Sequence, residues 1–263
     1  MSRRRWTTVR WVVFNQKGGV GKSTIVCNLA AASARDRRRT LVVDLDPQAN
    51  ASHYLLGRDY EQATPNLADF FAQTLGFKLF REGGKQYIHH TRFENLHVMP
   101  SAAGLEELEG KLETKYKIYK LRDALDELED YDAVFLDTPP AFGFYTLSAL
   151  IAGDRCLIPF DCDDFSRRAL YGLLENVAEV REDHNPKLEV GGIVVNQFQA
   201  RARLPQLLVD ELAAEGLPLL EPFISSSVKI RESHQAAKPL PYLAPSHKLA
   251  EQFEALYRNL QKR

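Results

Sequence analysis

The sequence predicts a doubly wound α/β fold with a mostly parallel central sheet and helices on both of its faces. Short β-branched runs alternate with helical patterns along the chain, which is typical of a parallel sheet. The runs are apolar throughout, as expected for strands that are covered on both faces. A glycine- and lysine-rich loop between the first run and the first helical pattern indicates that this α/β protein binds phosphate.

The expected elements follow in chain order, with apolar β-branched runs for strands and apolar residues at helical spacing for helices. Strands are expected at 9–15, 40–44, 96–99, 133–137, 155–159 and 190–196. Helices are expected at 22–35, 67–75, 105–115, 118–129, 165–182 and 205–215. Leu249, Phe253, Leu256, Tyr257 and Leu260 predict a last core helix. The stretch 76–92 has the weakest pattern and is expected to be an exposed excursion.

The composition indicates one globular domain over residues 1–263, with a short basic arm at 1–8. Hydrophobic residues make up 44% and charged residues 26% of the chain, which excludes a disordered protein. Lys and Arg (34 residues) nearly cancel Asp and Glu (35 residues), so a basic binding site has to be local.

The cysteines and the hydropathy pattern favour a cytoplasmic protein. Cys27, Cys156 and Cys162 form no Cys-x-x-Cys pair, so we expect reduced thiols that pack in the core rather than disulfides or an iron–sulfur cluster. The basic start of the chain is not followed by an apolar segment, and no apolar run approaches the about 20 residues of a membrane span. We therefore expect no membrane partner.

A phosphate-binding loop is predicted directly after the first strand. Residues 17–24 read Lys-Gly-Gly-Val-Gly-Lys-Ser-Thr and run into the helix 22–35. Glycines let backbone N–H groups approach a phosphate, and the helix N-terminus adds a partial positive charge. Lys22 is expected to reach the β- and γ-phosphates, and the Ser23 hydroxyl to ligate Mg²⁺. The generic motif has glycine where Gln16 stands, and a second lysine, Lys17, opens this loop.

Carboxylates follow two other predicted strands. Asp44 and Asp46 come at the end of the strand 40–44, and Asp137 ends the strand 133–137. Open parallel sheets bind ligands at the carboxyl ends of their strands. Phosphoryl transfer needs a positioned water and neutralised charge, which suits Asp46 and Asp137. The structural alternatives are a helix N-cap or an Asx-Pro turn for Asp46 and a strand-end acceptor for Asp137.

Together these segments resemble the ParA/MinD superfamily of P-loop ATPases, which has a deviant Walker A motif. The loop 17–24 resembles that motif, Asp44-Leu45-Asp46-Pro47-Gln48 resembles switch I, and Asp137-Thr138-Pro139-Pro140 resembles Walker B and switch II. The similarity extends through Cys162 and Asn196 to Lys238-Pro239. The resemblance implies a slow, partner-stimulated ATPase whose cofactors are ATP or ADP and Mg²⁺.

The resemblance also implies a role for each site residue. Lys17 would cross an interface to the nucleotide of a second copy in an ATP-sandwich homodimer. Asp46 would orient or activate the attacking water, while Asp137 supports Mg²⁺ through its water shell with help from Asp44. Asn196 matches a residue that reads adenine, with a turn-forming asparagine as the alternative. The implied catalytic set is Lys17, Lys22 and Asp46, the metal set is Ser23, Asp44 and Asp137, and the nucleotide-binding set is Lys17, Gly18, Gly19, Val20, Gly21, Lys22, Ser23, Thr24 and Asn196.

Partition-type relatives bind DNA without sequence preference, and two basic segments of this chain are similar to theirs. Arg201 falls on a DNA-contact arginine, although Gln199 replaces the usual Asp, and Lys229 falls on a second basic contact. Arg203 and Arg231 add charge to the same predicted loops. Clustered cations suffice for non-specific affinity, and a solvated basic loop is the alternative. The implied partners are double-stranded nucleoid DNA and a ParB-like or cargo-adaptor activator.

The sequence therefore predicts a dimerising ATPase, associated with the nucleoid, that segregates or positions a cargo in bacteria. The alternatives are a MinD-like membrane-cycling ATPase and an amide-forming ligase on the same fold. The tail at 249–260 fits a core helix better than an amphipathic anchor, which disfavours the first alternative. Lys17 and the basic segments disfavour the second. No motif specifies the cargo.

Overall fold

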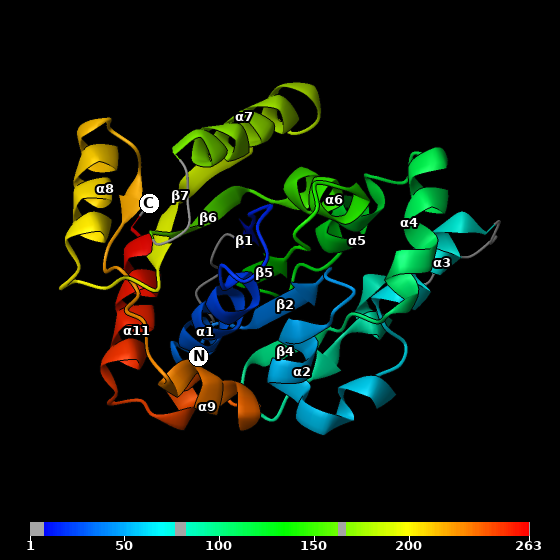
Figure 1. Cartoon of the computed structure of the whole chain (residues 1–263). Coiled ribbons are helices and arrows are strands. Elements are labelled where there is room, and N and C mark those ends of the chain that lie inside the picture. The colour runs from blue at the N-terminus through cyan, green and yellow to red at the C-terminus, as the bar shows by residue number, and fades with distance from the viewer. Residues whose placement is uncertain (1–7, 77–82, 163–166, 263) are drawn as a thin grey trace.

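The computed structural model describes residues 8–76, 83–162 and 167–262, and these form a central sheet covered by helices (Figure 1). In the described ranges the sheet has eight strands in the order β3-β4-β2-β5-β1-β6-β7-β8. All neighbouring strands are parallel except β3 and β4. The predicted fold class, a doubly wound and mostly parallel α/β sheet, is confirmed.

The strands lie close to their predicted positions. They are β1 (Val9–Val13), β2 (Thr40–Asp44), β3 (His89–His90), β4 (Leu96–Met99), β5 (Ala133–Asp137), β6 (Arg155–Asp161), β7 (Glu189–Asn196) and β8 (Leu219–Leu220). The short strands β3 and β8 were not predicted, because two residues are too few to show a periodicity.

The predicted helices are found at their expected positions, and some of their observed ends differ from the predicted ones. They are α1 (Lys22–Arg35), α2 (Asn50–Leu56), α3 (Leu67–Leu75), α4 (Gly104–Thr114), α5 (Lys120–Asp126), α6 (Phe144–Ala152), α7 (Arg167–Asp183), α8 (Arg203–Ala214), α9 (Lys229–Gln235), α10 (Leu240–Leu243) and α11 (Lys248–Leu260), with two short 3₁₀ helices at Gly57–Gln62 and Gly84–Tyr87. The predicted helix 118–129 is shorter than expected, and α2, α6, α9 and α10 were not predicted. The predicted last core helix is confirmed as α11.

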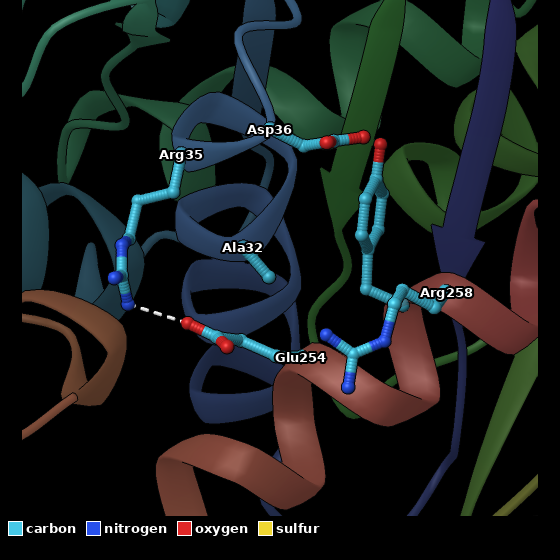
Figure 2. Close-up of a pocket in the computed structure, with 6 residues that line it drawn as sticks. Ala32, Arg35, Asp36, Glu254 and Arg258 are labelled. Atoms are coloured by element: carbon cyan, nitrogen blue, oxygen red, sulfur yellow. Dashed lines mark hydrogen bonds and ion pairs between the residues drawn. The ribbon is translucent and has the colours of Figure 1, made fainter. Parts of the chain in front are cut away.

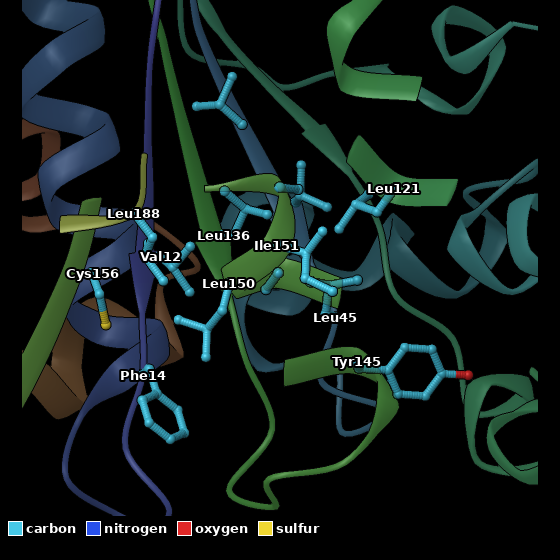
Figure 3. Packing of buried hydrophobic residues seen from close by; sticks show 14 of the residues in the cluster. Val12, Phe14, Leu45, Leu121, Leu136, Tyr145, Leu150, Ile151, Cys156 and Leu188 are labelled. Carbon is cyan, nitrogen blue, oxygen red and sulfur yellow. The ribbon is translucent and has the colours of Figure 1, made fainter. Parts of the chain in front are cut away.

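Each face of the sheet has its own hydrophobic core. Val12 and Phe14 pack into the cluster under α3 to α8, while Trp11 and Val13 pack into the cluster under α1, α2, α10 and α11. Figure 3 shows the first of these clusters, where side chains from β1 meet those from α5 and α6. Successive side chains of a strand point to opposite faces of the sheet, so alternate residues of one strand pack into different cores. This explains the uniformly apolar strands in the sequence.

Residues 83–92 of the predicted excursion 76–92 are mixed: five of them are exposed and two, Gly84 and Tyr87, are buried. Tyr87 is buried and its ring centroid lies 5.5 Å from that of Phe70. His89 and His90 form the short strand β3 and pair with Val98 and His97 of β4, respectively, and His90 stays exposed. Residues 77–82, the basic arm 1–7 and the start of the predicted helix at 165 lie outside the described residues.

The three cysteines form no disulfide within the described residues and lie in packing positions. Cys27 and Cys156 are buried, and Cys162 is half-buried against the larger core. Desolvation by burial raises the pKa of the Cys156 thiol. None of the helices in the described ranges has the length and apolar character that crossing a membrane requires.

Candidate functional site: a phosphate-binding loop over buried carboxylates

The loop between β1 and α1 has the backbone of an anion cradle. Gly21 is the N-cap of α1 and has φ +89°, and as glycine it offers no side-chain cap to the N–H groups of the first turn. A Cβ at Gly21 would lie 2.4 Å from Nδ2 of Asn196, so only glycine fits at this position. The uncapped helix end supplies N–H groups and a partial positive charge to an anion.

Both predicted lysines lie at this loop. Lys22 is buried, and its Nζ donates to the backbone oxygens of Asn15 at 2.9 Å and Lys17 at 3.0 Å. Asn15 fixes the start of the loop, since its Oδ1 accepts from the N–H of Lys17 and its Nδ2 donates to the carbonyl of Pro159 in β6. Burial lowers the pKa of Lys22, and the nearby Asp137 and Asp46 oppose that shift.

Asp137 is a buried carboxylate with unsatisfied oxygens. It is fully buried, and neither Oδ1 nor Oδ2 has a hydrogen-bond partner in the described part of the chain. It stands in register with Val13 of β1 and Asp44 of β2, directly beneath the loop. Burial, and next the charge of Asp44, raise the pKa of Asp137 well above its usual value, while the neighbouring Ser23 and Lys22 oppose the shift. A buried carboxylate without partners is unfavourable unless a cation or proton joins it.

Asp44 and Asp46 complete the acidic group. Oδ2 of Asp44 accepts from the backbone N–H and the hydroxyl of Ser52, both at 2.7 Å. Burial raises the pKa of Asp44 to about 7. Oδ1 of Asp46 accepts from the N–H of Gln48 at 3.0 Å, so Asp46 does form the Asx turn that the sequence offered as its alternative role. Burial raises the pKa of Asp46 as well.

These residues fit a magnesium ion with a nucleotide phosphate. The two unsatisfied oxygens of Asp137 need a positive partner, and Ser23 adjoins them at the start of α1. Clusters of three or more His, Cys, Asp or Glu that could hold a metal do not occur among the residues that the structure describes. Mg²⁺ is usually held by one or two carboxylates together with substrate phosphates and water, so a sparse protein ligand set suits it.

Asn196 lies beside the loop, next to a cavity of about 240 Å³. Its Nδ2 donates to the carbonyl oxygen of Val20 at 2.9 Å, which ties the end of β7 to the loop. The cavity is lined by Gly19, Gly21, Thr24, Asn196, Gln197, Ser225, Ser226, Ser227, Val228, Ile230 and Arg231. A mixed polar and apolar cavity that continues from a phosphate loop has the position expected for the base and ribose of a nucleotide.

The structure brings the two predicted basic segments together. The N–H of Phe198 donates to the carbonyl of Ile224 at 2.9 Å, and Phe198 forms a bridge to Ser225. Arg201 is exposed in the connection after β7, and Lys229 begins α9 and pairs with Glu232 at 2.6 Å. They follow the carboxyl ends of neighbouring strands, on the edge of the sheet that carries the loop.

Two details of the predicted basic site are wrong. Arg203, Lys229 and Arg231 do not lie in loops, because Arg203 is the first residue of α8, and Lys229 and Arg231 lie in α9. Arg231 also lines the cavity beside the loop glycines, so it is not remote from the phosphate site. Arg201 and Lys229 are therefore the better probes of a separate basic surface.

Sequence reasoning missed buried polar side chains that form hydrogen bonds to the site residues. Ser52 of α2 and Ser101 after β4 are buried and hydrogen-bonded to the Asp44–Asp46 segment. The hydroxyl of Thr24 lies 3.0 Å from Nε2 of His234, which stacks on Tyr54. Serine has no periodic signal of its own, so only the three-dimensional contacts reveal these roles.

Arg35, the last residue of α1, has a structural role. Arg35 donates to Glu254 of α11 (Figure 2) and to the carbonyl of Pro241. Arg35 and Glu254, together with Asp36 and Arg258, line a pocket of about 200 Å³ between the end of α1 and α11. Arg35 and Lys22 lie at opposite ends of α1, about 20 Å apart, so this pocket is not part of the loop site.

The loop, the buried carboxylates and the sheet edge together define a P-loop α/β nucleotide-binding protein. A family model described as an AAA domain matches residues 10–190. The chromosome partitioning protein ParA of Myxococcus xanthus is 34% identical over 265 residues, which cover 99% of this chain and 91% of that protein. The chain therefore belongs to the ParA/MinD family of P-loop ATPases, as the sequence predicted.

Solved structures share the fold across the chain. Cobyrinic acid a,c-diamide synthase of Mycobacterium smegmatis, with bound ADP and magnesium, superposes with a TM-score of 0.81 at 25% identity and covers 97% of this chain and 95% of its own. A Cyanothece McdA variant in complex with ATP superposes with a TM-score of 0.80 at 19% identity and covers 98% of this chain and 96% of its own. The second likeness shows the fold alone.

The buried aspartates are expected to make the free energy of unfolding depend on pH. Asp44 and Asp137 have higher pKa values in the folded chain than the 3.8 of a free aspartate, so folding favours their protonated forms. Their contribution to stability is complete below about pH 4; the contribution of Asp44 is lost as pH rises through about 7, and that of Asp137 as pH rises through its own raised pKa. We expect the free energy of unfolding, measured with urea without Mg²⁺ or nucleotide, to fall between pH 6 and pH 8 by up to about 1.4 kcal/mol per pH unit for each proton.

Asp137→Asn should flatten this dependence, whereas Asp130→Asn, at a carboxylate that is 56% exposed, should leave it unchanged. Equal slopes in the wild-type protein and Asp137→Asn would contradict the assignment.

Proposed function

We propose that this chain is a ParA-like ATPase that binds Mg²⁺-ATP, dimerises and binds DNA without sequence preference in order to position a cargo. The observation that carries the proposal is the fully buried Asp137, whose two carboxylate oxygens have no hydrogen-bond partner among the described residues, beneath a phosphate loop with two lysines. The chain is in addition 34% identical to a chromosome partitioning protein. Burying the Asp137 carboxylate is unfavourable by itself, and a bound cation with its phosphate would offset that cost.

Each residue at the loop has a task in this proposal. Lys22 exchanges its bonds to the loop carbonyls for bonds to the β- and γ-phosphates, and the N–H groups from Gly18 to Thr24 surround the phosphates. Ser23 and Asp137 would hold Mg²⁺, with Asp44 behind them, and the ion would neutralise phosphate charge. Asp46 accepts a hydrogen bond from the attacking water and directs it toward the γ-phosphate. Asn196, at the cavity beside Gly21, lies on the nucleobase side.

Two substitutions should separate nucleotide binding from hydrolysis. Lys22→Ala should weaken ATP binding about 10- to 100-fold, because a charged hydrogen bond contributes about 1.5–3 kcal/mol. Asp46→Ala should bind ATP normally and lower kcat about 10²- to 10⁴-fold, because it removes the group that orients the water. Binding is measured with a fluorescent ATP analogue and hydrolysis by phosphate release. An equal loss of binding in both variants would remove Asp46 from the hydrolytic role.

An amide-forming ligase is the second candidate, because a synthase of that kind shares the fold across 97% of this chain at 25% identity. Such an enzyme consumes ATP to activate an acid substrate and is nearly idle without it. Slow phosphate release from ATP alone, stimulated by a protein partner, favours the switch ATPase. No release under any condition without an added acid favours the ligase.

We propose that Lys17 acts in a second copy of the chain. It is half-buried at the outer end of the loop, where its charge can reach a nucleotide held by a facing subunit across a two-fold axis. Lys17 would neutralise phosphate charge on the ATP of the facing subunit, so ATP would itself form part of the interface.

Dimerisation should depend on ATP and on Lys17. Asp46→Ala protein should be dimeric with ATP and monomeric with ADP in light scattering, because the γ-phosphate is the charge that Lys17 neutralises. Adding Lys17→Ala should abolish the dimer, whereas adding Lys187→Ala, at an exposed lysine on the opposite edge of the sheet, should not. A monomer with both nucleotides would contradict the interface.

DNA binding would use Arg201 and Lys229, with Arg203 and Arg231 beside them. The Phe198–Ser225 bridge holds the two segments side by side, and a two-fold axis doubles the cluster. If each protomer neutralises about two phosphates, log K falls with log salt at a slope of about −3.6. A cargo and a ParB-like or adaptor activator complete the proposed cycle on the nucleoid.

Arg201→Glu with Lys229→Glu should erase this DNA binding and leave ATP hydrolysis intact, because both side chains lie off the phosphate loop. The matched control is Arg181→Glu with Lys187→Glu, which makes the same charge change at exposed positions on the opposite edge of the sheet. Binding of random duplex DNA and of anionic liposomes is compared with ATP-loaded Asp46→Ala protein. Retention by liposomes and not by DNA would favour a MinD-like membrane cycle instead.

A further inference from the structure

The backbone of Asp46 is held by a closed ring of hydrogen bonds from two buried serines. The N–H of Asp46 donates to Oδ1 of Asp44 at 3.3 Å, and Oδ2 of Asp44 accepts the Ser52 hydroxyl at 2.7 Å. The Ser52 oxygen accepts the N–H of Ser101 at 2.9 Å, and the Ser101 hydroxyl donates to the carbonyl of Asp46 at 2.6 Å. All four residues are buried.

The ring joins three separate elements around one residue. Asp44 ends β2, Ser52 lies in α2, and Ser101 follows β4 and precedes α4. It fixes both backbone groups of Asp46, while Gln48 occupies Oδ1 of its side chain and Pro47 restricts the next φ angle. The ring therefore constrains the direction in which the Asp46 carboxylate points.

Satisfying the Asp46 carbonyl does not require Ser101. That carbonyl also accepts the N–H of Ala49 at 2.8 Å, and Asp44 also accepts the backbone N–H of Ser52. Without either serine hydroxyl, the chain keeps a partner for each of these oxygens. As donors, the two hydroxyls therefore add orientation to oxygens that are already paired, which is a requirement of catalysis rather than of folding. The Ser52 oxygen is in addition the acceptor of the buried Ser101 N–H.

We propose that Ser52 and Ser101 are positioning residues that hold Asp46 in its water-orienting geometry. The inference rests on the proposed role of Asp46 and adds two residues to the machinery of hydrolysis. A small displacement of a group that positions a reactant lowers the rate of the chemical step and leaves binding of the phosphates unchanged.

The test is a split between kcat and ATP affinity. Ser101→Ala should lower kcat about 10- to 100-fold, with the KM for ATP and the unfolding midpoint close to wild type. Ser101→Thr keeps the hydroxyl and should recover most of the rate. Ser52→Ala should show the same split between kcat and KM, with a lower unfolding midpoint because the buried N–H of Ser101 loses its acceptor. The matched control is Ser148→Ala, which removes a fully buried serine hydroxyl that has no partner among the described residues and should keep wild-type kcat.

Wild-type kcat in both Ser101→Ala and Ser52→Ala, beside an inactive Asp46→Ala, would overturn the positioning role and leave the proposed function intact. A parallel loss of kcat and ATP affinity in the two serine variants would also overturn it, because that result reports a structural defect. Unchanged hydrolysis in Asp46→Ala would instead overturn the proposed role of Asp46 itself.

Discussion

Three carboxylates buried against a single buried lysine are the constraint on which the site depends. Asp44, Asp46 and Asp137 are at most 6% exposed, and Lys22 is 7% exposed above them. Burial raises the pKa of each acid and lowers that of the lysine, so the charged forms of all four side chains are unfavourable in the folded chain without a ligand. Such an arrangement favours the binding of protons or of a divalent cation with its phosphates.

The parallel sheet creates this concentration of charge. Asp44 and Asp137 stand in register on neighbouring strands, and β1 beside them leads into the phosphate loop. Asn196 at the end of β7 clamps the loop through the carbonyl of Val20. The apolar cores on both faces fix the strands, and the polar connections at one edge supply the chemistry.

The sequence predicted the sheet and the site residues because both leave local signals. Apolar runs located β2, β4 and β5 at their observed bounds, and the spacing of glycines and lysines located the loop. The partners of these residues leave no such signal. Ser52 and Ser101 act through contacts between distant segments, and the two-residue strand β3 is too short for a pattern. The basic residues were found in the sequence, but the sequence did not show that Arg203 begins α8 and that Arg231 lies in α9.

The central claim is that the buried carboxylates form a binding site for Mg²⁺ and nucleotide phosphate. It is tested most directly by measuring the number of protons released on binding. A preformed complex of Mg²⁺ with a non-hydrolysable ATP analogue is titrated into the protein at pH 7 in buffers of different ionisation enthalpy. We predict that binding releases protons, because the cation favours the ionised form of carboxylates whose pKa is raised, and that Asp137→Asn releases fewer. Binding heats that do not depend on the buffer, or proton uptake, would contradict this account.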